Sequence, residues 1–209
     1  RGIELPASPI RKLTPFADQA KKRGMKVYHL NIGQPDLPTP EKALNAVRKI
    51  GRKTLEYSPS QGLKSLRDKF AVYYRKFGID LSPEQIIVTA GGSEALLATF
   101  LTCFDEGDEV IITEPGYANY LGFAKAAGLV VKAVTSRIED RFALPSAEDF
   151  RKAITPKTKA ILICNPNNPT GYLYSPEELF QLRDLVKEYD LFLIADEVYR
   201  EFVYTDEPY

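Results

Sequence analysis

Two short apolar runs joined by a helical segment constrain the fold of this chain most strongly. Residues 161–164 (ILIC) and 191–195 (LFLIA) are flanked by charge, which is typical of parallel strands buried on both faces. Between them, Ser175 is expected to cap a helix, with Pro176 as its first residue and Glu178 completing a capping box. Because a strand–helix–strand unit crosses over right-handedly, both strands should end at one edge of a sheet, where open α/β sheets bind ligands.

Strand-like and helix-like segments alternate through most of the chain and predict a layered fold. The five candidate strands are residues 86–90, 109–113, 129–134, 161–164 and 191–195. Helical patterns lie between them, which indicates an α/β protein with a mainly parallel sheet. We therefore predict a three-layer α/β/α fold over residues 41–209, preceded by a proline-rich N-terminal arm over residues 1–40.

The charge balance excludes partners that need a strong electrostatic field. The chain has 28 basic and 28 acidic side chains, so its net charge attracts neither nucleic acid nor an anionic membrane. No apolar run approaches the ~18 residues that span a bilayer. Cys103 and Cys164 lie in apolar segments and are expected to be small core residues in a reducing compartment. With no signal-peptide pattern after Arg1, we expect a trimmed cytoplasmic chain that binds a small molecule and no metal.

A glycine turn follows the first candidate strand and opens a helical segment. Gly91 and Gly92 let the backbone approach a ligand, and the exposed amides at the start of a helix attract an anion such as phosphate. Ser93 could add its hydroxyl, or it could simply cap the helix. The turn, which continues with Glu94, is neither a P-loop nor the dinucleotide-binding GxGxxG pattern.

Polar and aromatic side chains also follow three other candidate strands. Tyr117 could stack on a flat ligand ring or pack in the core. Asn168 could donate to a ligand or belong to an ordinary turn. Asp196, near Tyr199, ends a buried strand and needs a cationic or hydrogen-bonded partner, for which Arg200 is a candidate.

Taken together, these four groups match one ligand. They provide for a phosphate at the glycine turn, a flat ring against Tyr117, an oxygen facing Asn168 and Tyr199, and a protonated ring nitrogen facing Asp196. Pyridoxal phosphate has these four features. A carboxylate opposite its pyridine nitrogen keeps that nitrogen protonated, so the ring can accept electrons from the substrate α-carbon.

Five motifs carry a resemblance to a known family, in this order: NIGQPD, VTAGGSEAL, EPGYANY, NPNNPTG and ADEVY. In order and spacing they resemble the class I/II, fold-type I aminotransferases, which use pyridoxal phosphate, and the resemblance covers essentially the whole chain. It implies a cofactor-binding large domain and a homodimer. The residues it assigns are Gly92, Ser93 and Glu94 at the phosphate, Tyr117 on the ring face, Asn168 and Tyr199 at the ring oxygen, and Asp196 at the ring nitrogen.

The resemblance implies three further features. Tyr57 would reach the phosphate of the neighbouring subunit's cofactor, and Gly33 would lie against the substrate carboxylate. The 168–169 peptide bond, and also the 114–115 bond, would be cis. The N-terminal arm would form part of a small domain.

One departure from the family concerns the lysine that forms a Schiff base with the cofactor. In the family it follows the Asp and Tyr strand by a few tens of residues, which places it beyond Tyr209, and Lys187 does not fit its place. Two arginines, the small C-terminal domain and two strands next to the one ending at Asp196 are missing as well. We therefore expect an amino-terminal part of a longer enzyme, inactive by itself and with unpaired strand edges.

The expected reaction of the longer enzyme is transfer of an amino group from an α-amino acid, with aspartate as the leading candidate, to a 2-oxo acid. Two alternatives within the same family are a C–S β-lyase and an aminocyclopropane-forming synthase. A third is a non-catalytic regulatory domain that binds pyridoxal phosphate, against which the lack of a basic N-terminal extension argues. A nucleotide-binding domain is disfavoured because the chain has no phosphate loop of the right spacing.

Overall fold

The chain folds into two units, as the computed structural model shows for residues 11–33 and 35–204. One unit is Thr14–Ala90, and the other contains the residues from Gly91 onward together with the short 3-10 helix η1 (Arg11–Leu13). The predicted parallel sheet lies entirely in the second unit.

The Thr14–Ala90 unit is helical. Its elements are α1 (Thr14–Lys22), α2 (Glu41–Arg48), α3 (Lys64–Arg75) and the 3-10 helix η2 (Pro83–Gln85). The side chain of Arg67, which is buried, joins α3 to η2: its Nη1 donates to the carbonyl oxygen of Pro83 at 2.6 Å, and its Nε donates to that of Gly62 at 3.3 Å. This arginine binds backbone carbonyls rather than a carboxylate.

The predicted strand at residues 86–90 is not formed, so that prediction is wrong for the described chain. Within this segment the amide of Val88 donates to the carbonyl oxygen of Gln61 at 3.0 Å, and this bond belongs to no strand pairing. Ile87 is 67% exposed. A strand needs a partner strand to satisfy its backbone groups, and none of the described residues provides one here.

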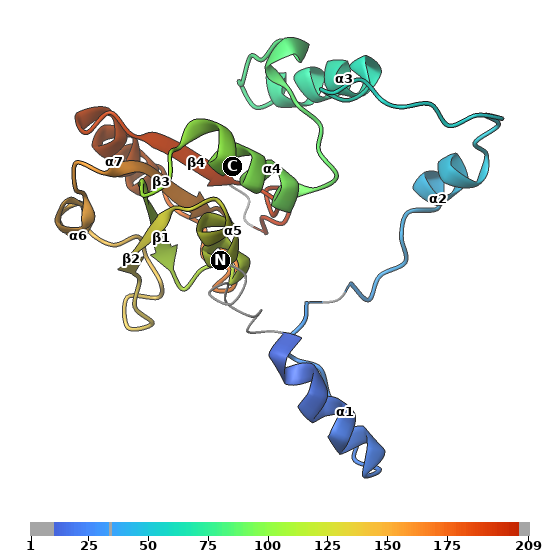
Figure 1. Cartoon of the computed structure of the whole chain (residues 1–209), viewed down its shortest axis with the longest axis horizontal. Coiled ribbons are helices and arrows are strands. Elements are labelled where there is room, and N and C mark those ends of the chain that lie inside the picture. The colour runs from blue at the N-terminus through green and yellow to red at the C-terminus, as the bar shows by residue number, and fades with distance from the viewer. Residues whose placement is uncertain (1–10, 34, 205–209) are drawn as a thin grey trace. The chain divides into compact units, whose positions relative to one another are not determined.

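The sheet has four parallel strands in the order β2-β1-β3-β4 (Figure 1). They are β1 (Glu109–Glu114), β2 (Val130–Thr135), β3 (Thr158–Cys164) and β4 (Phe192–Asp196). Parallel pairing confirms the predicted fold class. Among the described residues β4 pairs on one side only, and its Phe192 and Leu193 are 57% and 40% exposed, so the predicted unpaired edge is present.

Helices cover both faces of the sheet and produce the predicted three layers (Figure 1). These helices are α4 (Gly92–Cys103) and α5 (Asn119–Ala126) on one face, and α6 (Ala147–Ala153) and α7 (Pro176–Glu188) on the other. Alternate residues of β3 serve the two faces: Leu162 packs in the α4/α5 core and Ile161 in the α6/α7 core. No helix of the described residues has the length and apolarity to cross a bilayer.

The two cysteines differ in burial. Cys164 is buried, as predicted, whereas Cys103 is exposed, so its prediction as a core residue is wrong. The buried stripe of α4 runs through Leu96 and Phe100, and Phe104, four residues further on, packs against the same core. Cys103 is the last residue of α4, and the backbone becomes extended directly after it at Phe104, so Cys103 lies at an exposed helix end.

Candidate cofactor site

A pocket of about 210 Å³ lies at the carboxyl ends of the strands, and we call it the strand-end pocket. It lies beside β1 and β3, where the chain connections leave in opposite directions, which is where open α/β sheets bind ligands. Its lining residues are Gly92, Ser93, Leu96, Tyr117, Tyr120, Cys164, Asn168, Asp196, Val198 and Tyr199. Six of the predicted site residues are therefore brought together.

The amino end of α4 forms one wall of this pocket. Gly91 is the N-cap of α4, and Ser93 is the second residue of the helix. The alternative that Ser93 caps the helix is therefore wrong. A Cβ built on Gly92 would meet no atom within 4 Å, so there is open space beside the backbone at this helix terminus. The helix dipole places partial positive charge at the amino end of this twelve-residue helix, which favours an anion at this wall.

Tyr117 follows β1 and is held from two directions. Its hydroxyl accepts a hydrogen bond from Asn119 Nδ2 at 2.6 Å. Its ring lies edge-to-face with that of Tyr120, with centroids 5.3 Å apart and planes at 84°. The ring is only half-buried and lines the pocket, so it can contact a flat ligand there.

Asn168 and Tyr199 come from the turns after β3 and β4 and lie side by side. Asn168 Nδ2 and the hydroxyl oxygen of Tyr199 are 3.4 Å apart, a long hydrogen bond. Since both groups can donate, an acceptor atom of a ligand in the pocket could receive a hydrogen bond from each.

Three cis peptide bonds shape the loops around the pocket. They are Glu114–Pro115, Asn165–Pro166 and Asn168–Pro169. The family resemblance predicts the cis bonds at Glu114–Pro115 and Asn168–Pro169. It does not predict the cis bond at Asn165–Pro166.

Asp196 ends β4, and hydrogen-bond donors from two elements hold its carboxylate. Its Oδ2 accepts from the hydroxyl of Tyr120 at 2.7 Å, and its Oδ1 accepts from the amide of Val198 at 3.1 Å. The suggested ion pair with Arg200 is not found, because Arg200 Nη1 instead lies 2.5 Å from Glu197 Oε2. Asp196 therefore keeps acceptor capacity for a ligand.

Two neighbours of this carboxylate were not assigned to the site from the sequence. Tyr120 and Cys164 both line the pocket. Burial, followed by the hydrogen bond to Asp196, raises the pKa of Tyr120 far above its usual value. Burial likewise raises the pKa of the Cys164 thiol. Both groups therefore stay protonated near neutral pH. Tyr120 could have been suspected because it is a second aromatic residue only three positions after Tyr117, at the same strand end.

Three predicted site residues lie outside the pocket lining. Glu94 is exposed in the first turn of α4 and is not among the lining residues. Gly33 and Tyr57 belong to the Thr14–Ala90 unit, where both are exposed. Their assigned roles stay predictions.

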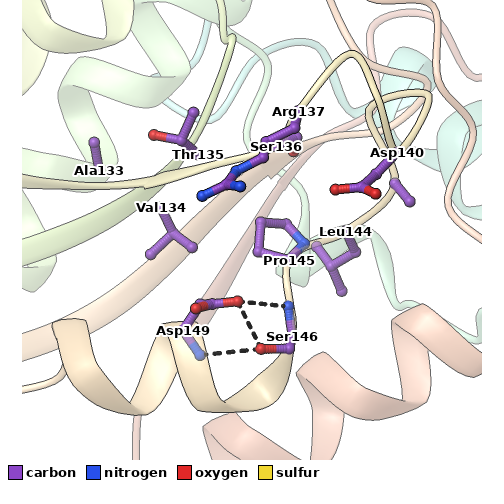
Figure 2. A pocket seen from close by; sticks show the side chains of 11 residues that line it. Ala133, Val134, Thr135, Ser136, Arg137, Asp140, Leu144, Pro145, Ser146 and Asp149 are labelled. Carbon is purple, nitrogen blue, oxygen red and sulfur yellow. Dashed lines mark hydrogen bonds between the residues drawn. The ribbon is translucent and has the colours of Figure 1, made fainter.

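A larger hollow of about 860 Å³ lies at the end of β2, beside α6 (Figure 2). It contains none of the predicted site residues. Two of its polar lining residues pair with each other: Ser146 Oγ donates to Asp149 Oδ2 at 2.6 Å and accepts from the Asp149 amide at 3.3 Å (Figure 2). These bonds form the capping box of α6, so size alone does not mark this hollow as a reaction site.

Comparison with known proteins gives one consistent result. The family model described as aminotransferase class I and II matches residues 25–209. An aspartate/prephenate aminotransferase of Thermus thermophilus is 38% identical over 191 residues, which are 90% of this chain and 49% of that protein. An aspartate aminotransferase of Thermotoga maritima is 38% identical over 206 residues, which are 98% of this chain and 54% of that protein.

Solved structures agree with the sequence matches. A double mutant of the Thermus thermophilus aspartate aminotransferase superposes with a TM-score of 0.92 at 36% identity, covering 99% of this chain and 54% of the other. The Thermotoga maritima aspartate aminotransferase gives 0.91 at 38% identity, covering 99% and 55%. The chain thus spans about half the length of the relatives it matches.

Proposed function

Because the chain belongs to the aminotransferase class I and II family, we propose that the full-length protein containing it transfers an amino group from an α-amino acid to a 2-oxo acid, with pyridoxal phosphate as cofactor. Aspartate is the proposed donor, since the most similar relatives include aspartate aminotransferases. The observation that carries the proposal is the placement of Asp196, fixed by two hydrogen bonds, in the same pocket as the amino end of α4.

The residues of the strand-end pocket fit this cofactor. Gly92 and Ser93 would hold the phosphate at the amino end of α4, where there is open space beside the backbone. Tyr117 would contact the face of the ring, and Asn168 and Tyr199 would donate to the ring oxygen. Asp196 would accept from the protonated ring nitrogen. The pocket is smaller than the roughly 300–1,000 Å³ of drug-sized ligand sites, which suits one wall of a larger site.

When bound, pyridoxal phosphate supplies an electron sink for the electron pair left on the substrate α-carbon after proton removal. The chain's own residues prepare this step. Asp196 holds a proton on the ring nitrogen, and Asn168 and Tyr199 fix the ring oxygen. Tyr117 limits the tilt of the ring. The family resemblance assigns movement of the α-carbon proton to a lysine beyond residue 209.

We extend the proposal to a homodimer in the cytoplasm. Helices α1 and α2 contain no buried residue, and Phe16 and Val47 on them are 70% and 68% exposed. Tyr57 is fully exposed as well, which suits a residue that serves a neighbouring subunit. Apolar faces of this kind favour burial against a partner. Cys103 and Cys164 are unpaired thiols, which suits a reducing compartment.

The test is a product analysis with the full-length protein, pyridoxal phosphate and aspartate, with and without a 2-oxo acid. Formation of a new amino acid that requires both substrates would support the proposal. Release of a 2-oxo acid from a cysteine conjugate without an acceptor would identify a β-lyase instead. Tight cofactor binding without turnover of any amino acid would favour the regulatory domain.

A further inference from the structure

Resting on the proposed function, we propose that Tyr120 is a positioning residue that fixes Asp196 against the cofactor's ring nitrogen and at the same time sets the ring of Tyr117. Tyr120 is the last residue of the EPGYANY motif, but the family resemblance assigns it no role. The inference rests on two contacts that one buried side chain makes.

Tyr120 contacts both groups that are proposed to bind the cofactor ring. Its hydroxyl donates to Asp196 Oδ2 at 2.7 Å, across 76 residues of sequence. Its ring meets that of Tyr117 edge-to-face, with 5.3 Å between centroids. The side chain is 2% exposed and belongs to the α4/α5 core, so packing leaves it little freedom to move.

Asp196 needs such an anchor because of where it lies. It is the last residue of β4, which pairs on one side only among the described strands, and it is only half-buried. Its second donor, the amide of Val198, is two residues away on the same turn and moves with it. Tyr120 comes from α5, a separate element, and so ties the carboxylate to the core.

The hydrogen bonds also leave the carboxylate free to bind a ligand. A carboxylate has about four lone-pair positions, and Tyr120 and Val198 occupy one on each oxygen of Asp196. Because burial keeps the hydroxyl of Tyr120 protonated, it donates whether or not a ligand is present. The carboxylate is therefore fixed before the cofactor arrives, and no reorganisation is needed on binding.

The test compares two tyrosine-to-phenylalanine variants of the full-length protein. Tyr120→Phe keeps the ring that packs on Tyr117 and removes only the hydroxyl. Tyr174→Phe is the matched control: Tyr174 is 3% exposed, and its hydroxyl bonds to Thr113 Oγ1 at 3.3 Å, in the α6/α7 core. Both variants lose a buried hydroxyl, but only one of these hydroxyls contacts Asp196.

The readout is the affinity of the apo protein for two ligands. One is pyridoxamine 5'-phosphate, and the other is its analogue with carbon in place of the ring nitrogen. Tyr120→Phe should lower the affinity for pyridoxamine 5'-phosphate about tenfold and change the affinity for the carbon analogue less than about twofold. This difference is expected for loss of one hydrogen bond that acts through the ring nitrogen. Tyr174→Phe should change neither. Equal weakening of both ligands by Tyr120→Phe, or no change in either, would overturn the inference.

Asp196→Ala separates failure of this inference from failure of the proposed function. If Asp196 binds the ring nitrogen, this variant should lose most of the preference for pyridoxamine phosphate over the carbon analogue. If the preference persists, the proposed role of Asp196 is wrong. If Asp196→Ala removes the preference and Tyr120→Phe retains it, only the role of Tyr120 is wrong.

Discussion

The side chain of Asn167 joins the turn after β3 to the turn after β1: its Nδ2 donates to the carbonyl oxygen of Pro115 at 3.1 Å. The same amide donates to Thr170 Oγ1 at 2.7 Å, within its own turn. Asn167 is 9% exposed, so it forms these bonds away from solvent. The two turns carry Tyr117 and Asn168, which face the strand-end pocket from different strands.

We expect Asn167→Ala to loosen the pocket. The change leaves the Pro115 carbonyl and the Thr170 hydroxyl without this donor, which should lower the free energy of unfolding by about 1–3 kcal/mol. Affinity for pyridoxamine phosphate should fall as well, because the turns are no longer joined. Urea unfolding and ligand titration of the full-length protein measure the two effects. Unchanged ligand affinity would show that the hydrogen bonds of Asn167 do not determine the shape of the pocket.

Asp196→Ala should lower kcat/KM of the full-length enzyme by roughly 10³ or more, because the charge that holds a proton on the ring nitrogen is lost. The cofactor should still bind, since the phosphate wall at α4 is unchanged, and its absorbance after gel filtration measures this. Asp184→Ala is the control: Asp184 is an exposed acid on α7 that pairs with Arg183. Near-normal turnover of Asp196→Ala would refute the assigned role.

Glu109 makes a pH-dependent contribution to stability. Burial raises its pKa, but hydrogen bonds from the hydroxyls of Thr155 and Thr158 and the charge of Lys132 outweigh this and hold the pKa below its usual value. A carboxyl whose pKa is lowered on folding stabilises the fold above its unfolded pKa, about 4.3 for Glu, and loses this contribution as the pH falls through the folded value.

We therefore expect Glu109→Gln to destabilise the protein most at pH 7. The difference in urea midpoint between wild type and variant should shrink as the pH falls below about 4.3, the usual pKa of a glutamate. Glu148→Gln, which changes an exposed acid of α6, should leave the midpoint unchanged at either pH. If the difference in urea midpoint between wild type and Glu109→Gln stayed constant from pH 7 to acid pH, the pKa of Glu109 would not be lowered by folding.

The segment from β3 to β4 was predicted in most detail, because local sequence determines it. Ser175 and Glu178 form the predicted capping box, and the flanking apolar runs form parallel strands. The predicted site residues in the strand-end pocket were found for a related reason: polar side chains at the ends of parallel strands must meet at one edge of the sheet.

Features that depend on distant parts of the chain were missed. The bond from Tyr120 to Asp196 spans 76 residues, and no local pattern specifies which side chains meet across elements. The strand expected at residues 86–90 has suitable residues, but it needs a partner that its own sequence cannot supply. Cys103 is exposed at the last position of α4, and the apolar composition of the segment does not show where the helix ends.

The carboxylate of Glu178 caps α7 and also accepts a hydrogen bond from a neighbouring loop. Its Oε2 accepts from the amide of Ser175 at 2.7 Å, as in a capping box, while its Oε1 accepts from the amide of Leu144 at 2.7 Å. The hydroxyl of Tyr172 lies 3.2 Å from the same Oε1. One carboxylate thus caps α7 and also holds the loop that precedes α6.

Ser175→Ala should remove the cap alone and lower the free energy of unfolding by about 1 kcal/mol. Glu178→Ala should cost more, about 2–3 kcal/mol, because the Leu144 amide and the Tyr172 hydroxyl also lose their acceptor. Urea unfolding of the two variants gives the difference, and amide hydrogen exchange at Leu144 should accelerate only in Glu178→Ala. Equal destabilisation with unchanged exchange at Leu144 would mean that the loop holds its place without this carboxylate, and that the cap accounts for the whole effect.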